Sequence, residues 1–517
     1  MTVPRRFHIV TFGCQMNVYD SGRLAALLES RGWAEAPSKE DADFIFLNTC
    51  SIREKAVQRV LARLRELKPL KKAKPGLVVA VGGCAAEQEG MDLVRQAPIV
   101  DIVTGPRRLS EIPSALEGFI PGGPPVVMGG DPPEGENPVA LSGAPAGGFP
   151  EGGAHLGEYP LSDGGREAAR ADAAGAPEAL RGRRGNGAGK PLILPPCEAR
   201  GPAPLSAFVT IMEGCDNFCA YCVVPGLRGP ERSRPPGDVM AEARSLVGRG
   251  AREITLLGQN VNSYRPAEAG RSERGGLAFV RLLEEAAAVP GLWRLRFTTS
   301  HPKDFPGELP RLFGTLPKLS PHIHLPLQAG SDRVLRMMGR KYTAAGYMEI
   351  VGSLRESAPG ASITTDVIVG FPGETEEDFA MTLRIMEEAS FDSIFSFKYS
   401  DRPGTRAAGM PDKVPEEVKS RRLTEAIALQ RGISLKINRA LEGTCQELLV
   451  TGAGREPGQL SGRTGTNKIV NFDGPSELAG TLARVRITRS GPVSLKGELA
   501  AARAPGAGRE AAAGPAS

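Results

Sequence analysis

The chain has 517 residues, which suggests about three domains, and Gly (64) and Pro (44) together make up about a fifth of it. The net charge of +5 does not by itself indicate a nucleic-acid-binding protein. No run of about 18 apolar residues is present, which excludes a transmembrane helix, and the first residues lack the apolar core of a signal peptide. We therefore expect a cytoplasmic protein whose 8 cysteines serve as metal ligands or in catalysis rather than as disulfides.

The first region, residues 5–121, alternates short apolar segments with amphipathic ones. Strands are predicted at 7–12, 43–48, 77–83 and 100–105. The segment SGRLAALLESRG between the first two strands has helical spacing and ends in Gly. This alternation predicts an α/β domain with a parallel sheet covered by helices.

The next region, residues 122–200, is a predicted linker. Residues 121–200 hold 18 Gly and 13 Pro but only two aromatic residues, Phe149 and Tyr159. Such a segment cannot bury enough apolar surface to offset the entropy lost on ordering. We expect it to be disordered, and we expect the same of the Ala/Gly/Pro-rich tail, 501–517.

Two further regions follow the linker. Residues 201–433 alternate strands and helices again, with six strands predicted at 207–212, 252–258, 293–299, 322–327, 362–370 and 393–400. Six such units predict a partial (β/α)6 barrel with its chemistry at the carboxyl ends of the strands. Residues 434–500 change to short alternating strands with Gly turns, which predicts a small β-barrel of the OB-like kind.

Three cysteines lie in one short run, EGCDNFCAYCVVPG, directly after the first strand of the partial barrel. The spacing C-x3-C-x2-C lets one loop place three thiolates around one iron–sulfur cluster. Three ligands leave one iron open to a further ligand, as open zinc sites do in catalysis. A zinc site completed by a distant His, or unrelated buried thiols, are the alternatives for this set, Cys215, Cys219 and Cys222.

Three more cysteines are far apart in the sequence, but each follows a predicted strand. Because the carboxyl ends of parallel strands lie along one edge of a sheet, they are predicted to converge there. A single cysteine after a strand is more often a small core residue, but three in the same position indicate a second cluster site, formed by Cys14, Cys50 and Cys84.

The other cysteines and the histidines have no partner at ligand spacing. Cys197 lies at the edge of the linker and Cys445 opens the last small barrel, and we interpret both as structural or incidental. His322 and His324 share one strand face by the two-residue period. We expect these two, and His301, to be packed or hydrogen-bonded rather than metal ligands.

Several stretches resemble one known family. The segments CDNFCAYC, GFPGETEEDF, TFGCQMNVYDS and LNTCSIREKA are similar to those of the radical S-adenosylmethionine (SAM) methylthiotransferases, and most similar to the MiaB-type tRNA methylthiotransferases. The resemblance covers nearly the whole chain outside the linker and the tail. It implies an N-terminal methylthiotransferase domain, a radical SAM core and a C-terminal TRAM domain.

The resemblance also implies the cofactors, which are two 4Fe–4S clusters and SAM. One cluster would be held by Cys215, Cys219 and Cys222. It would bind SAM at its open iron and cleave it to a radical that removes hydrogen from an unreactive C–H bond. The second cluster, which would supply the sulfur, would be held by Cys14, Cys50 and Cys84. A second SAM would supply the methyl group, while the protein orients the reactants and excludes water.

By the same matching, other residues are candidate cofactor contacts. Tyr221 in the cluster loop is expected near the SAM adenine. Gly370, Phe371 and Gly373 belong to a turn after the fifth strand whose glycines allow close backbone approach to SAM, although an ordinary βα turn is the alternative. Further SAM or substrate contacts are predicted by position alone at other strand ends, namely Gln259, Asn260, Ser300, Gln328 and Asp366.

Members of this family modify different targets: N6-isopentenyladenosine or N6-threonylcarbamoyladenosine beside the tRNA anticodon, or an aspartate of a ribosomal protein. The segments around the first two cysteines resemble the first group, and an anticodon loop offers unstacked bases. We therefore expect methylthiolation at C2 of N6-isopentenyladenosine in tRNA, by a monomer served by a low-potential electron donor. Phosphate contacts are expected from the small barrel, through Arg463, Lys468, Arg484, Arg486 and Arg489.

A non-catalytic RNA-binding protein with structural zinc or iron–sulfur sites is the alternative function. The loop with three cysteines distinguishes the two, because an open ligand position suits catalysis and a closed four-ligand site suits a structural role.

Overall fold

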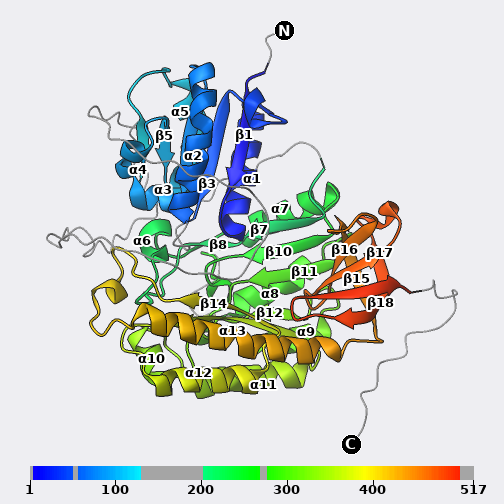
Figure 1. The fold of residues 1–517 in the computed structure, drawn as a ribbon. Helices are drawn as coiled ribbons and strands as arrows, with labels where there is room; N and C mark the ends of the chain where they lie inside the picture. Colours follow the sequence, from blue (N-terminus) through cyan, green and yellow to red (C-terminus); the bar gives the residue numbers. More distant parts are fainter. Residues whose placement is uncertain (1–3, 51–55, 130–201, 268–275, 501–517) are drawn as a thin grey trace, which may run out of the picture.

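The computed structural model describes residues 4–50, 56–129, 202–267 and 276–500. Most of the predicted linker, Cys197 and the predicted tail lie outside the described residues. Figure 1 shows three units: an N-terminal α/β domain, a central partial barrel below it, and a small β-barrel at the side of the central unit. The predicted α/β class with a C-terminal β-barrel is confirmed.

The N-terminal domain is a six-stranded parallel sheet in the order β2-β1-β3-β4-β5-β6. Its strands are β1 (Arg6–Thr11), β2 (Ala34–Glu35), β3 (Phe44–Thr49), β4 (Val78–Gly83), β5 (Ile102–Thr104) and β6 (Val126–Met128). Helices cover both faces: α1 (Gln15–Ser30), α2 (Ala56–Ala73), α3 (Cys84–Glu89), α4 (Met91–Gln96) and α5 (Ile112–Glu117). Every residue of β3 and β4 is buried, because alternate side chains enter two separate cores, one on each face.

Strand β6 corrects the predicted start of the linker at residue 122. Gly and Pro surround the apolar triplet VVM, so the composition of the segment hides it. The triplet pairs in parallel with β5, and Met128 is buried in the same core as Phe44. The sheet therefore extends one strand beyond the predicted domain.

The central unit has the six predicted parallel strands, arranged as two sheets, β11-β10-β7 and β12-β13-β14, which an isolated bridge between Leu295 and Leu319 connects. The strands are β7 (Ser206–Thr210), β10 (Glu253–Leu257), β11 (Arg294–Thr298), β12 (His322–His324), β13 (Ser362–Val369) and β14 (Ser393–Lys398). Helices pack on the outside: α7 (Pro236–Gly248), α8 (Leu277–Ala287), α9 (Leu309–Thr315), α10 (Asp332–Met337), α11 (Ala344–Ser357), α12 (Glu376–Ala389) and α13 (Glu416–Arg439).

A short segment between β7 and α7 carries the cysteine loop. It consists of a two-stranded antiparallel pair and one short helix, β8 (Met212–Glu213), α6 (Val224–Arg228) and β9 (Arg232–Ser233).

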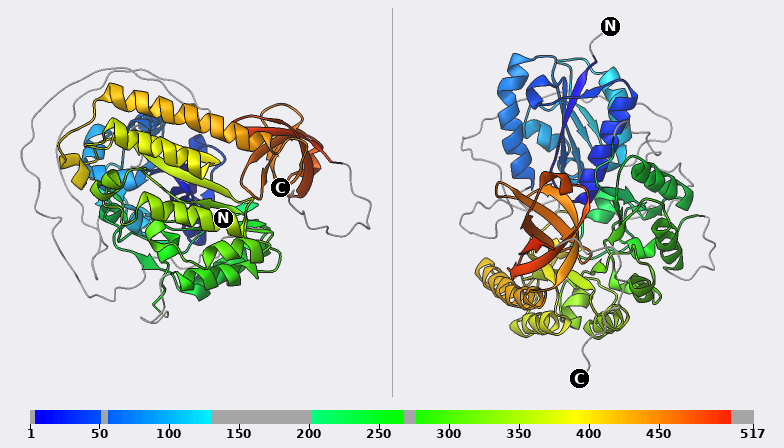
Figure 2. Two further views of the ribbon diagram at one scale, coloured as in Figure 1. Left: turned by 90° about the horizontal axis from the view of Figure 1, so that it is seen from below. Right: turned by 90° about the vertical axis from the view of Figure 1, so that its right-hand side faces the viewer.

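The third unit is a closed five-stranded barrel in the order β15-β16-β17-β19-β18. Its strands are β15 (Cys445–Ala453), β16 (Gln459–Thr464), β17 (Ile469–Asp473), β18 (Leu482–Ser490) and β19 (Ser494–Leu499). Helix α13 passes unbroken through the predicted boundary between residues 433 and 434 and leads directly into this barrel, as Figure 2 shows.

Polar contacts join the units to one another. Helix α1 of the N-terminal domain packs against β7, and its Asp20 forms a buried ion pair with Arg228. The small barrel is held by Arg296 of β11, whose Nη2 donates to the Thr464 carbonyl at 2.9 Å. Within the part of the chain that the structure describes, no helix is both long and apolar enough to cross a membrane.

Candidate active site

The loop with three cysteines begins at Gly214, directly after β8, and its path is set by backbone contacts. Gly214 has φ +73, and a Cβ atom there would lie 2.0 Å from the Pro230 carbonyl oxygen, so only glycine fits. The Cys215 amide donates to the Gly229 carbonyl at 3.2 Å. Ala220 is held from both sides, by hydrogen bonds with Met338 and Ala407. The loop is therefore a rigid support for its thiols.

The three thiols of this loop lie close enough to influence one another's charge. Burial raises the pKa of Cys215, and it raises the pKa of Cys222 to about 12, with the Cys219 thiolate adding to both effects. Hydrogen-bond donors point at the sulfur atoms: the Asn217 amide is 3.4 Å from the Cys215 Sγ, and Arg340 Nη1 is 3.6 Å from the Cys219 Sγ. These donors oppose the effect of burial and favour deprotonated, metal-bound sulfur.

Arg340 is a functional candidate that the sequence analysis missed. It follows α10, more than a hundred residues from the cysteine loop, and its side chain is buried. Two further donations orient the guanidinium, to the Pro326 carbonyl at 3.1 Å and to the Tyr342 hydroxyl at 2.9 Å. No local motif marks this arginine, because only the tertiary fold brings α10 against the loop.

The second set of thiols is assembled at one edge of the N-terminal sheet. Cys14 is the N-cap of α1, Cys50 follows β3, and Cys84 is the first residue of α3 after β4. The Cys14 thiol is hydrogen-bonded with Cys50, which lowers the pKa of Cys14 to about 6 although burial opposes this. The Cys84 thiol lies within electrostatic range of Cys14, and burial raises the pKa of Cys84. The structure therefore brings the three predicted cysteines together.

Two buried asparagines, Asn17 and Asn48, form a hydrogen-bond network beside the second set of thiols. Asn17 Oδ1 accepts from the Cys14 amide at 3.3 Å and from its thiol at 3.4 Å. Asn17 and Asn48 exchange two hydrogen bonds, each 2.9 Å long, and both are fully buried. A Cβ atom at Gly13 (φ +130) would lie 2.6 Å from the Cys50 Cβ, so the chain can approach this closely only with glycine there.

Polar atoms at the carboxyl ends of β10 and β11 have unused hydrogen-bonding capacity. Gln259 Oε1, Asn260 Oδ1 and Ser300 Oγ are buried and have no hydrogen-bond partner among the described residues. An unpaired buried polar group costs about 1–3 kcal/mol, so a cluster of them at strand ends indicates a site for a polar ligand. These are three of the residues predicted from position alone, and SAM, with its amino acid and ribose groups, suits them.

The donor chemistry therefore fits the groups that the resemblance implies, with thiolates for iron–sulfur clusters and unpaired polar atoms for SAM. Among the described residues, no three His, Cys, Asp or Glu side chains are arranged to hold a single metal ion.

The turn after β13 is closed by a buried ion pair. Gly370 (φ +73) donates its amide to Glu374 Oε2 at 2.5 Å, and the same oxygen accepts from Arg422 of α13 at 2.7 Å. Burial raises the pKa of Glu374 to about 7 despite this partner. Gly373 also has a positive φ, +76. The Phe371 ring is fully buried against Tyr399, with ring centroids 5.3 Å apart, so it supports the turn from the core.

The inner wall of the partial barrel carries a polar and an aromatic part. On β13 the side chains of 363, 365, 367 and 369 are buried beneath the helices, so Thr364 and Asp366 face the interior. His324 Nδ1 on β12 shares a hydrogen bond with Thr364 Oγ1 (3.1 Å). The other ring nitrogen, His324 Nε2, lies 3.4 Å from Asp366 Oδ2. Phe395 and Phe397 of β14 share this face and are 55% and 39% exposed.

The histidines are hydrogen-bonded, as predicted. His301 Nδ1 accepts from the Lys303 amide at 3.1 Å, and His322 Nε2 lies 3.3 Å from Thr364 Oγ1. Burial lowers the pKa of His322 to about 3, with Arg296 nearby adding to the effect. The remaining described cysteine, Cys445, is exposed at the start of β15.

Tyr221 belongs to the cysteine loop, and Gln328 follows β12 and pairs with β13. Tyr221 is half-buried and packs with the core that holds Phe371. Burial raises its pKa well above the usual range, and Arg340 opposes the shift. Gln328 has φ +71, and its backbone pairs with the Asp366 carbonyl at 2.8 Å.

The basic residues of the small barrel have two different environments. Arg463 and Lys468 are partly buried at the contact with the central unit, where Lys468 pairs with Asp392 at 2.5 Å. Three others are exposed on β18, namely Arg484, Arg486 and Arg489. These three are exposed, whereas Lys468 is paired across the contact with the central unit.

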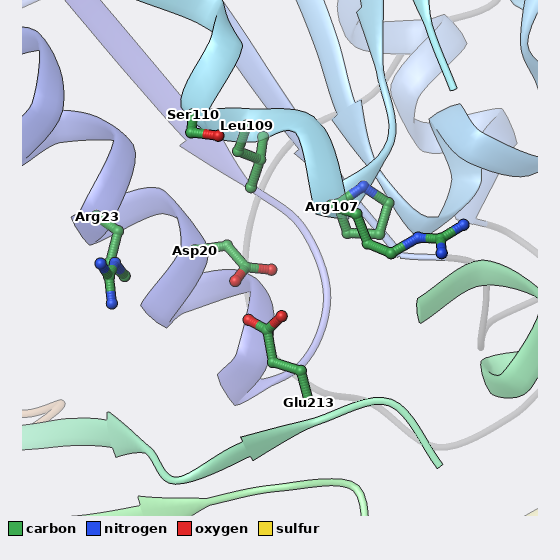
Figure 3. Close-up of a pocket in the computed structure, with 7 residues that line it drawn as sticks. Asp20, Arg23, Arg107, Leu109, Ser110 and Glu213 are labelled. Carbon is green, nitrogen blue, oxygen red and sulfur yellow. The ribbon is translucent and has the colours of Figure 1, made fainter. Parts of the chain in front are cut away.

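A small cavity of about 10 Å³ lies where the N-terminal and central units meet, with room for about one water molecule. Figure 3 shows Asp20 of α1 and Glu213 of β8 pointing toward each other there. Burial raises the pKa of Glu213 to about 7, and Asp20 adds to the shift.

Family models match all three units. Residues 6–105 match the Uncharacterized protein family UPF0004, residues 209–386 match the Radical SAM superfamily, and residues 439–500 match the TRAM domain. Together with the fold, these matches define a radical SAM enzyme with a C-terminal TRAM domain.

Two curated relatives cover nearly the whole chain, and both are named tRNA-2-methylthio-N6-dimethylallyladenosine synthase. The protein of Geotalea uraniireducens is 40% identical over 96% of this chain and 100% of its own length. The protein of Syntrophobacter fumaroxidans is 44% identical over 96% of both chains. The chain belongs to the family of the tRNA-2-methylthio-N6-dimethylallyladenosine synthases.

Among solved structures, the radical SAM methyltransferase TsrM from Kitasatospora setae is similar at 15% identity, with a TM-score of 0.49, over 89% of this chain and 81% of the other.

Proposed function

We propose that this chain methylthiolates N6-dimethylallyladenosine in tRNA, with two iron–sulfur clusters and SAM. The observation that carries the proposal is the pair of three-thiol sets, each buried or half-buried, in two domains that contact each other, with unpaired polar atoms at the strand ends of one of them. Membership of the family supplies the substrate class.

Each group that the reaction needs has residues to hold it. Cys215, Cys219 and Cys222 would hold the SAM-binding cluster, and the second cluster would be held by Cys14, Cys50 and Cys84. When bound, these groups supply the radical, the sulfur and the methyl group of the product. Gln259, Asn260 and Ser300 bind polar groups of SAM, and Arg340 keeps a positive charge beside the thiolates.

The substrate base is proposed to lie against the aromatic part of the inner wall. Phe395 and Phe397 are on the last strand of the partial barrel, where their exposed rings offer a face for an unstacked base and its dimethylallyl group. His324 and Asp366 sit beside them and can hydrogen-bond a base edge. An apolar wall favours the dimethylallyl substituent over the charged threonylcarbamoyl group, which would lose hydration there.

The tRNA backbone is proposed to contact β18. Arg484, Arg486 and Arg489 are exposed and can neutralise phosphates, while Arg463 and Lys468 support the barrel itself. We further propose that the protein acts as a monomer and accepts electrons from a low-potential donor.

Nucleoside mass spectrometry of tRNA tests the proposal. A strain that lacks its own enzyme accumulates the dimethylallyl nucleoside, and expression of this chain should restore the 2-methylthio derivative. Anaerobically reconstituted protein should hold about eight irons, as two four-iron clusters require. Unmodified tRNA together with tightly bound zinc would instead support a structural metal site in an RNA-binding protein.

A further inference from the structure

Arg228 comes from the central unit but reaches the thiol set of the N-terminal domain. It ends α6, six residues after Cys222, and helices α6 and α3 contact each other. Its Nη2 donates to Asp20 Oδ2 at 2.8 Å, and the guanidinium also hydrogen-bonds with the Cys84 thiol. The side chains of Arg228 and Asp20 are only 6% and 7% exposed. One buried cation therefore contacts both a carboxylate and a candidate cluster ligand.

We propose that Arg228 is a positioning residue for the second cluster, whose charge it balances from across the domain interface. The proposal rests on the proposed function, because it requires a cluster on Cys14, Cys50 and Cys84.

The charges around Arg228 support this role. Acidic groups face it from three elements, namely Asp20 of α1, Glu213 of β8 and the Cys84 thiol of α3. Burial works against the charged guanidinium, yet these groups hold the pKa of Arg228 well above its usual range. A cluster bound by three thiolates adds negative charge at the same place. Without the arginine, that charge would be buried beside a carboxylate, which is strongly unfavourable.

Arginine suits this position better than lysine does. The planar guanidinium can donate to a carboxylate and to a sulfur atom at the same time, whereas an ammonium is a single point charge. A donor to a ligating sulfur and a nearby cation both stabilise the more negative, reduced state of an iron–sulfur cluster, and so raise its reduction potential.

A nearby arginine provides a matched control. Arg234 is 1% exposed and crosses the same domain interface, where its Nη1 donates to the Tyr19 hydroxyl at 3.2 Å and pairs with Glu242 at 2.6 Å. Among the described residues, Arg234 contacts Tyr19, Glu242 and the Thr210 carbonyl rather than a thiol. Removal of Arg234 should weaken the interface as removal of Arg228 does, but leave the second cluster unchanged.

The test uses full-length protein in which Cys215, Cys219 and Cys222 are all replaced by Ala, so that the second set alone can bind a cluster. After anaerobic reconstitution, iron is counted and the reduction potential is measured by EPR-monitored titration. Arg228→Met should shift the potential to a more negative value, Asp20→Asn should shift it to a more positive value, and Arg234→Met should leave it unchanged.

The opposite signs exclude a merely structural role for the ion pair, because loss of either partner would then have the same effect. If Arg228→Met does not fold, the positive shift of Asp20→Asn decides the question. Equal potentials in all variants that hold about four irons would overturn this inference alone. A parent protein that binds no iron would overturn the proposed second cluster and this inference with it.

Discussion

The two thiol sets are built in opposite ways. In the central unit, one eight-residue loop carries all three cysteines, and backbone contacts with Pro230, Met338 and Ala407 hold it within the same unit. In the N-terminal domain, the cysteines come from three strand ends, and only the parallel sheet brings them together. The loop set is therefore a local structure, whereas the other depends on a whole domain.

The charges around the two sets follow the same division. The cation beside the loop set, Arg340, belongs to the same unit as the loop. The cation beside the second set, Arg228, is supplied by the neighbouring unit. The loop set therefore relies on contacts within one unit, while the environment of the second set is complete only when the two units meet.

The largest effect is expected where the loop set is broken. Cys215→Ala should abolish both SAM cleavage and product formation, because two thiolates hold a four-iron cluster poorly. Chromatographic measurement of 5′-deoxyadenosine checks this, and the iron content should fall by about half. Cys445→Ala, at an exposed cysteine of the small barrel, is the control and should be fully active. Normal deoxyadenosine formation by the Cys215 variant would refute the role of the loop.

Breaking the second set should separate the two halves of the chemistry. Cys50→Ala should still cleave SAM, because the loop set remains intact, but it should form no methylthiolated nucleoside. Deoxyadenosine and modified nucleoside are measured in the same reaction. If this variant made product at the normal rate, Cys50 would not be a cluster ligand.

The dependence of the second set on its domain can be tested through the amide network. Asn48→Ala removes the buried hydrogen bonds that Asn48 makes with Asn17 and Ser21, and should lower the free energy of unfolding of the N-terminal domain by about 1–3 kcal/mol. Denaturant titration of the apoprotein measures this. Thr451→Ala, on the exposed surface of the small barrel, is the comparison and should change stability little. An unchanged stability would show that the network does not support the thiols.

The smallest effect on activity is expected from a change in the inner wall of the partial barrel, which belongs to neither thiol set. Phe395→Ala should raise KM for tRNA about tenfold, since loss of one base–aromatic contact costs about 1–3 kcal/mol. It should leave SAM cleavage without tRNA unchanged. Val493→Ala, which removes an exposed apolar side chain from the small barrel, is the control. A KM equal to that of the unaltered enzyme would place the substrate base elsewhere.

Much of this molecule could be predicted from its sequence, for identifiable reasons. The six strands of the partial barrel and the five of the small barrel follow from short-range apolar periodicity, which each segment carries by itself. Strand β6 was missed because only three apolar residues stand among Gly and Pro. Gln259, Asn260 and Ser300 could be named as candidate contacts because they follow strands, and the position of a residue after a strand is readable without coordinates.

The charged partners of the site were not predictable in the same way. The sequence analysis assigned no role to Arg340 or Arg228, because nothing in the sequence showed which charged residues would lie beside a thiol. Their roles arise from burial beside a sulfur atom or another charge, and burial depends on contacts between distant segments. Lys468 shows the converse: it was expected to bind phosphate, but it is paired with Asp392 at the barrel contact.

The sequence by itself determined most of the strands, the order of the three units and the six candidate cysteines, because periodicity and motif spacing are properties of neighbouring residues. Only the tertiary structure decided which buried arginine lies beside which thiol, which basic residues remain exposed, and which aromatic rings line the barrel. These features depend on pairing across domain interfaces and on desolvation, and both are set when distant segments pack together.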